Sequence, residues 1–144
     1  MNRRKPKTLR VTGIVETALH AEDLRRSTEF YRRLLGCETL QEDARFCALR
    51  IAPSQVLLLF RRGGTTEPSV MPGGVIPPHD GAGRLHVGFG IPVESFEAWE
   101  RRLVELNIAV ESCVRWPRGG RSLFFRDPDG HLVELLSPGT WENY

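Results

Sequence analysis

The sequence is poor in cysteine. It has only three cysteines among 144 residues, Cys37, Cys47 and Cys113, and no CxxC spacing joins them. An odd number without such spacing gives no support to a disulfide framework. We therefore interpret the cysteines as small buried residues of a reducing, cytoplasmic protein. A catalytic thiol is the alternative, but no neighbouring residue argues for one.

Long apolar runs and a strong charge of either sign are also missing. No run approaches the roughly 20 apolar residues that span a bilayer. The net charge is +2, from 20 Lys and Arg against 18 Asp and Glu, which is too small to indicate nucleic-acid binding. The one dense basic run, RRKPKTLR, is not followed by the apolar region of a signal peptide. We expect a disordered basic arm over residues 1–10, and no membrane or nucleic-acid partner.

The two halves of the chain show the same order of predicted strands and helices. Apolar periodicities predict a strand, a helix and three strands in each half. The strands fall at 11–20, 37–43, 44–51, 55–61, 84–91, 108–115, 121–127 and 131–137, and the helices at 21–36 and 94–107. A chain of this length suits one domain. We predict an α+β fold with two βαβββ modules in a single domain, 11–138: module one at 11–61, module two at 85–138, and a tail at 139–144.

The connection between the modules, residues 62–84, contains six glycines and four prolines. This composition predicts a loop with no helix or strand of its own. Loops of such length are usually functional or disordered. We predict that this one folds over a site and that Pro77 and Pro78 direct His79 there as a general base or gate. A loop histidine that meets only water is the alternative.

Alignment of the two halves reveals candidate ligands. A constant offset of 76 places Leu58 on Glu134, and the distance from the first strand to the helix places Glu16 near His86. Three of these four equivalent positions hold residue types that bind metals. Each has an ordinary explanation when it is taken alone. Glu16 could be an edge charge or a helix-capping partner, and His86 could be a satisfied core residue.

Glu134 is the most informative of the three. It shares a strand face with Leu132 and Leu136, so a buried carboxylate there must be paired, protonated or metal-bound. One imidazole and two carboxylates suit a divalent ion such as Zn, Mn, Fe, Ni, Co or Mg, and three ligands leave positions open for water and substrate. Two residues without side chains on the face of the histidine would leave room for a ligand: Gly88 and Gly90.

Three stretches resemble the vicinal oxygen chelate superfamily, which includes glyoxalase I, bleomycin-resistance proteins, fosfomycin-resistance transferases and extradiol dioxygenases. The opening strand and helix of that superfamily are similar to GIVETALHAEDLRRSTEFYRRLLGCE, and its fifth and eighth strands to LHVGFGI and FFRDPDGHLVEL. The resemblance implies βαβββ modules that curl into a cup around a divalent metal bound by Glu16, His86 and Glu134. It also implies a symmetric homodimer, in whose swapped form Glu16 comes from one chain and the other two ligands from its partner.

The sequence departs from common patterns of the superfamily at three positions. Many members carry His or Gln where Glu16 stands. Glyoxalase I has a fourth ligand, a carboxylate, at the position of Leu58, and fosfomycin transferases have a threonine at the position of Ala18. The resemblance therefore implies the superfamily without selecting one of its activities.

The resemblance further implies a lyase, isomerase, transferase or dioxygenase whose metal acts as a Lewis acid on a small, oxygen-rich substrate. A carboxylate that leaves the metal, Glu16 or Glu134, would serve as base, with His79 beside it. Arginines near an open metal suit such a substrate. The predicted substrate contacts are Arg118, Arg121, Ser122 and Phe60. The alternatives are a solvated basic turn for the arginines, and a metal-free binding protein of the bleomycin-resistance type for the whole chain.

Overall fold

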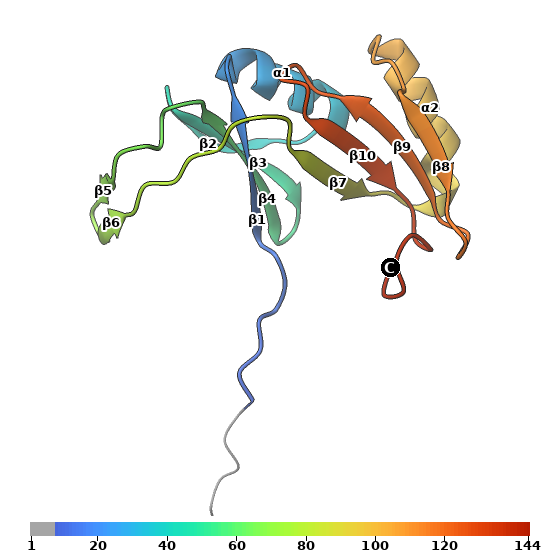
Figure 1. Cartoon of the computed structure of the whole chain (residues 1–144), viewed down its shortest axis with the longest axis horizontal. Helices are drawn as coiled ribbons and strands as arrows, with labels where there is room; N and C mark the ends of the chain where they lie inside the picture. Colours follow the sequence, from blue (N-terminus) through green and yellow to red (C-terminus); the bar gives the residue numbers. More distant parts are fainter. Residues whose placement is uncertain (1–7) are drawn as a thin grey trace, which may run out of the picture.

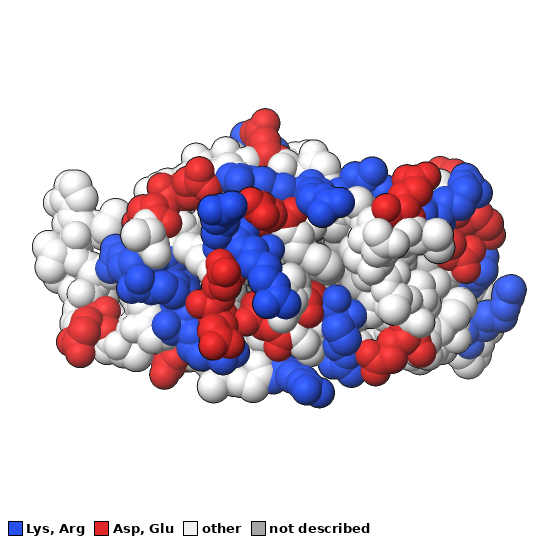
Figure 2. Space-filling model, turned by 90° about the horizontal axis from the view of Figure 1, so that it is seen from above, with Lys and Arg blue, Asp and Glu red and all other residues white. Residues whose placement is uncertain are grey.

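The computed structural model describes residues 8–144, and the first seven residues of the predicted basic arm lie outside this range. Residues 8–15 form no helix or strand and are exposed. No helix among the described residues is long and apolar enough to cross a membrane. On the side of the molecule seen in Figure 2, basic and acidic side chains alternate without a wide area of one sign.

Module one has the predicted βαβββ order. It consists of β1 (Glu16–Ala21), α1 (Leu24–Leu35), β2 (Thr39–Glu42), β3 (Phe46–Ala52) and β4 (Gln55–Arg61). The strands form one sheet in the order β1-β4-β3-β2, with β1 parallel to β4. The first strand begins at Glu16 and not at residue 11, because its partner β4 begins only at Gln55 and leaves residues 11–14 without a neighbour.

Local chemistry explains both ends of α1. The Asp23 side chain accepts a hydrogen bond from the backbone N–H of Arg26 at 3.0 Å and so caps the N-terminus of the helix. The helix therefore begins at Leu24, three residues after the predicted start at residue 21. Gly36 ends the helix in the left-handed conformation, with φ of 63°, and its N–H donates to the Arg32 carbonyl. The predicted stop at Gly36 is therefore confirmed.

Module two repeats the same order. It consists of β7 (His86–Gly90), the 3-10 turn η1 (Val93–Ser95), α2 (Phe96–Glu105), β8 (Ser112–Arg115), β9 (Arg121–Arg126) and β10 (Leu132–Leu136). Its sheet has the order β7-β10-β9-β8, with β7 parallel to β10. Figure 1 shows the two sheets side by side, with both helices on one side of them and the tail on the other. The predicted fold of two βαβββ modules is confirmed.

Strand register shows how closely the modules correspond. In module one Glu16 lies opposite Val56 and Ala18 opposite Leu58. In module two His86 lies opposite Leu132 and Gly88 opposite Glu134. Glu16 and His86 therefore occupy equivalent places in their sheets, as do Leu58 and Glu134. The alignment predicted from sequence is reproduced by the pairing.

The connection between the modules differs from its prediction, because it contains a β-hairpin. Strands β5 (Ser69–Met71) and β6 (Gly74–Ile76) pair antiparallel as a separate two-stranded sheet. Pro72 and Gly73 form the turn, and the β-branched residues Val70 and Val75 lie directly opposite each other. The prediction gave weight to glycine and proline and missed this short apolar pair.

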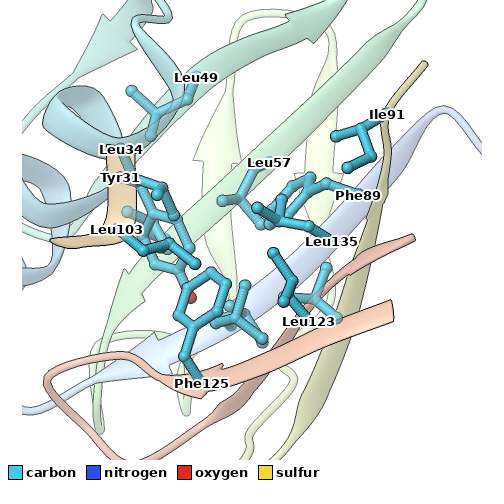
Figure 3. Close-up of a cluster of buried hydrophobic side chains, with 14 of the residues drawn as sticks. Tyr31, Leu34, Leu49, Leu57, Phe89, Ile91, Leu103, Leu123, Phe125 and Leu135 are labelled. Atoms are coloured by element: carbon cyan, nitrogen blue, oxygen red, sulfur yellow. The ribbon is translucent and has the colours of Figure 1, made fainter. Parts of the chain in front are cut away.

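One hydrophobic core joins the modules. Side chains from both helices and both sheets meet in a single buried cluster, and Figure 3 shows them pointing toward one another. The members drawn and labelled there are Tyr31, Leu34, Leu49, Leu57, Phe89, Ile91, Leu103, Leu123, Phe125 and Leu135. The cysteines follow the prediction only in part. Cys47 is buried, but Cys113 is exposed because it lies on the edge strand β8.

The DPDGH segment fastens module two to module one. Asp127 accepts a hydrogen bond from the Tyr31 hydroxyl at 2.8 Å and another from the backbone N–H of His131 at 2.9 Å. The His131 ring accepts from the N–H of Leu85 through Nδ1, so its Nε2 carries the proton that it donates to the carbonyl of His20 at 2.8 Å. This buried network holds β10 in place against β1 and α1.

Candidate metal centre

Each sheet has one face that packs into the core and one that faces away from the helices, which we call the open face. On β7 and β10 the core face carries Val87, Phe89, Val133 and Leu135. Strand pairing arranges the open face of module two in three rows. Row one is His86, Leu132 and Arg126; row two is Gly88, Glu134 and Phe124; row three is Gly90, Leu136 and Ser122.

Rows one and two bring two predicted ligands together. His86 Nε2 lies 3.2 Å from Glu134 Oε2. The Glu134 side chain is only 9% exposed, whereas the His86 side chain is 50% exposed. The carboxylate between two leucines is therefore buried against an imidazole that reaches solvent.

The other ring nitrogen defines the chemistry of this pair. His86 Nδ1 lies 2.9 Å from the carbonyl oxygen of Leu132, which can only accept, so Nδ1 carries a proton. In the neutral ring Nε2 is then an acceptor, facing the acceptor Oε2 of Glu134. Two acceptors at this distance require either a proton shared between them, carried by Nε2 or by the carboxyl group, or a metal ion bound to both.

Neighbouring residues hold the pair in place. The Phe124 ring stacks beside the His86 ring, with centroids 6.3 Å apart. A Cβ at position 88 would lie 3.0 Å from Leu136 Cδ2 and 3.6 Å from Glu134 Oε2, so Gly88 lets both side chains lie close against β7. The room expected over Gly90 is not free, because the hydroxyl of Tyr144 occupies it.

Glu16 lies on the other sheet. It is exposed, and it occupies row one of module one, where Ala18 and Leu58 form row two and His20 and Phe60 form row three. Within residues 8–144 of one chain, no three His, Cys, Asp or Glu side chains come together to hold a metal. One chain therefore supplies the His86–Glu134 pair on the open face of module two, and Glu16 on the open face of module one, without a second predicted ligand beside it.

The loop histidine packs on module one. His79 meets the ring of Phe60 at 4.8 Å and that of His20 at 5.7 Å between centroids. Its backbone N–H donates to the Thr65 carbonyl at 2.9 Å, and the Thr65 hydroxyl donates to the His79 carbonyl at 2.6 Å. His79 is thus held over row three of the face that carries Glu16, and the predicted substrate contact Phe60 lies beneath it.

His20 lies under this loop. It is 4% exposed, and its Nδ1 has no hydrogen-bond partner among the described residues. Gly81 packs against its ring so closely that a Cβ there would clash. Burial lowers the pKa of His20 below its usual value, and the neighbouring His79 lowers it further.

The predicted substrate arginines do not converge on the pair. Arg121 lies on the opposite face of β9 from Ser122, stacks 3.7 Å from the Phe96 ring centroid, and donates to Glu97 Oε1 at 2.9 Å. Its contacts therefore belong to α2, and Arg118 lies exposed in the turn before β9. Ser122 does lie on the open face, where its hydroxyl accepts from Trp116 Nε1 at 2.7 Å.

Three residues near the site were not predicted. Phe124 could have been found from strand alternation, because it lies two residues from Ser122 on the same face. Trp116 and Tyr144 could not, because they reach the open face from a turn and from the tail, where no periodicity applies.

Most of the chain matches one family of known proteins. The family model described as Glyoxalase/Bleomycin resistance protein/Dioxygenase superfamily matches residues 13–135. Metallothiol transferase FosB of Staphylococcus haemolyticus is 28% identical over 130 residues, which are 87% of this chain and 83% of that protein.

Solved structures agree on the fold. A lactoylglutathione lyase from Agrobacterium tumefaciens superposes with a TM-score of 0.82 and 31% identity, over 96% of this chain and 99% of that one. The fosfomycin resistance protein FosX of Listeria monocytogenes superposes with a TM-score of 0.65 and 21% identity, over 89% and 94% of the two chains.

Proposed function

Because the chain belongs to the glyoxalase/bleomycin resistance protein/dioxygenase superfamily, we propose that it is a divalent-metal-dependent enzyme acting on a small, oxygen-rich substrate. Glu16, His86 and Glu134 would hold the metal. The observation that carries the proposal is the His86–Glu134 pair, in which two acceptor atoms lie 3.2 Å apart.

The residues present fit a metal. A histidine that binds a metal commonly donates its other ring N–H to a carbonyl, which fixes the tautomer, and His86 does this to Leu132. One imidazole and two carboxylates suit Zn, Mn, Fe, Ni, Co or Mg. The fourth-ligand position of glyoxalase I is occupied by Leu58, so three protein ligands would leave the remaining positions to water and substrate.

A second copy of the chain would complete the site. Glu16 occupies the place on its sheet that His86 occupies on the other, and one chain does not bring them together. We propose a symmetric homodimer in which Glu16 of one subunit faces His86 and Glu134 of the other. Exposed apolar residues beside Glu16 and on the hairpin support such an interface: Ile14, Val15, Val70, Met71, Val75 and Ile76.

The roles of the residues follow from their surroundings. A bound metal would polarise two substrate oxygens and stabilise negative charge that develops on them. Glu134, buried against β7, would stay on the metal. No hydrogen bond or ion pair among residues 8–144 restrains the exposed Glu16 carboxylate, so Glu16 is the better base. His79, held over the same open face as Glu16, is the second base.

Elemental analysis of protein purified without added metal or chelator tests this proposal. We expect stoichiometric metal in the natural chain, little in His86→Gln and Glu134→Gln, and an unchanged amount in the control Glu94→Gln, which alters an exposed carboxylate of η1. A metal-free chain that still binds small molecules would favour the alternative of a sequestering protein, in which a proton joins His86 and Glu134.

Metal-loaded protein should then be screened for turnover. The names of two relatives, a metallothiol transferase and a lactoylglutathione lyase, suggest thiol-derived substrates for the first test. α-Keto hemithioacetals come first, followed by epoxides with added thiol, catechols and acyl-CoA epimers. Turnover that disappears in Glu16→Gln would support Glu16 as ligand or base.

A further inference from the structure

We propose that Tyr144, together with Trp116, closes one end of the substrate site and binds the far end of the substrate. The proposal rests on the metal-dependent function proposed above. It limits the substrate to a compact molecule that lies over row two, with chelating oxygens at one end and a hydrogen-bond donor at the other.

The tail that carries Tyr144 is folded onto module two. The Gly139 N–H donates to the Tyr144 carbonyl at 2.7 Å, and Trp141 and Tyr144 exchange backbone hydrogen bonds of 3.2 Å. Gly120 packs against Gly139 and Thr140 with no space for a Cβ. The tail therefore packs directly on the turn before β9. In Figure 1 the tail lies on the side of the sheet away from the helices.

Two aromatic side chains contact residues of row three. The Tyr144 hydroxyl lies where a Cβ of residue 90 would be, and it donates to the Leu136 carbonyl at 3.1 Å. The φ angle of Gly90 is not positive, so space is the reason for this glycine. At the β9 end of the row, the Trp116 side chain donates to the hydroxyl of Ser122, which is completely buried. Row three is thus covered in part: Ser122 and Leu136 are buried, whereas Gly90 keeps an exposed surface beside the Tyr144 hydroxyl. The row beside His86 that carries no such cover is row two.

Module one is closed in the same way. Its row three, His20 and Phe60, is covered by His79, which comes from the segment after β4. Tyr144 comes from the segment after β10, the equivalent strand. Each module thus uses the chain that follows its last strand to place a ring over the same row, which indicates a built feature and not a chance contact of the tail.

The spacing of the rows sets the length of the substrate. Successive rows are two residues apart along a strand, or about 7 Å. A substrate bound beside Glu134 in row two would thus need to extend by roughly one row spacing to reach the Tyr144 hydroxyl at row three. That hydroxyl gives its hydrogen to Leu136, so it offers only lone pairs to a ligand. Burial raises the pKa of Tyr144, which keeps the hydroxyl protonated.

Hydroxamates test this inference, because they chelate metals through two oxygens and can be varied in length. Protein loaded with Co(II) is titrated with acetohydroxamate and benzohydroxamate while its visible absorption is followed. The natural chain should bind acetohydroxamate and largely exclude the longer benzohydroxamate. Tyr144→Ala should strengthen benzohydroxamate binding by about 10- to 100-fold, as expected when a steric overlap is removed, with little change for acetohydroxamate.

A second variant isolates the hydroxyl. Tyr144→Phe should weaken 3-hydroxypropanohydroxamate by about 2- to 10-fold, the value of one hydrogen bond, and leave acetohydroxamate unchanged. Trp141→Ala is the matched control, because Trp141 belongs to the same tail but is 67% exposed. It should behave like the natural chain with all three hydroxamates.

The outcomes separate the two proposals. If Co(II) binds and acetohydroxamate shifts its spectrum, but Tyr144→Ala changes no preference for length, the inference about Tyr144 is wrong and the metal site stands. If Trp141→Ala changes that preference as much as Tyr144→Ala does, the effect belongs to the whole tail and the inference is also wrong. If the chain binds no Co(II), the proposed function fails and this inference fails with it.

Discussion

The two modules share an element order and a strand register, but they assign different chemistry to the same places. Where module two has Glu134, module one has Leu58, and where module two has Gly88, module one has Ala18. At these places module one therefore carries only apolar side chains, whereas module two carries a carboxylate beside a residue that has no side chain. Two modules with the same fold can therefore carry apolar residues in one and a candidate metal ligand in the other at equivalent positions.

The largest effect, a loss of metal affinity, is expected when Glu134 of module two is replaced by leucine, the residue type at the equivalent position 58 of module one. Glu134→Leu removes a proposed ligand and a buried carboxylate at once. Loss of an outer-shell partner alone costs metal affinity about 10- to 100-fold, so loss of this ligand should cost more than about 100-fold. Competitive titration with a chromophoric chelator measures the change, and Leu58→Met is the control. Unchanged affinity would remove Glu134 from the site.

A second change tests the link that holds the modules in register. Tyr31→Phe deletes the hydroxyl that donates to Asp127 and leaves a buried carboxylate with one partner fewer. We expect the free energy of unfolding to fall by about 1–3 kcal/mol, measured by urea denaturation. Phe30→Leu, a change to the half-buried neighbour of Tyr31 on α1, should not remove this bond. If Tyr31→Phe is neutral, the network does not stabilise the module contact.

The connection after module one exposes an apolar hairpin. Val75→Asp would place a charge on that hairpin, and we expect dissociation of the proposed homodimer to become at least about 10-fold more favourable. Light scattering over a concentration series measures this. Val104→Asp on α2, where the valine is 73% exposed, is the control. A natural chain that is monomeric at every concentration would contradict the shared site.

The smallest effect concerns row three, where module one has His20 and module two has Gly90. The folded chain lowers the pKa of His20 below 6.5, so the unfolded chain binds the proton more readily. Stability should therefore fall as pH drops below about 6.5 and level off below the lowered pKa. Thermal melts at several pH values should show a shallower acid dependence in His20→Asn. An identical dependence would mean that other groups cause it.

Features that depend on neighbours along the chain could be predicted from the sequence. Alternation and helical spacing predicted the element order, and Gly36 predicted the end of α1. The repeat matched Leu58 to Glu134 and Glu16 to His86, as the strand pairing does. These features could be read because strand and helix periods are local properties of the backbone. The same alternation placed Glu134 on a face with two leucines, and the structure adds the histidine that pairs with it.

Contacts between groups that lie far apart in the chain could not be predicted in this way. Alternation could not say which face of β9 looks toward α2, so Arg121 was assigned to substrate although it stacks on Phe96. It could not place Glu16 on a sheet apart from His86, or Tyr144 over Gly90, because such distances depend on how sheets, turns and tail pack. Packing responds to the shapes of residues far apart in the chain, and no local period records them.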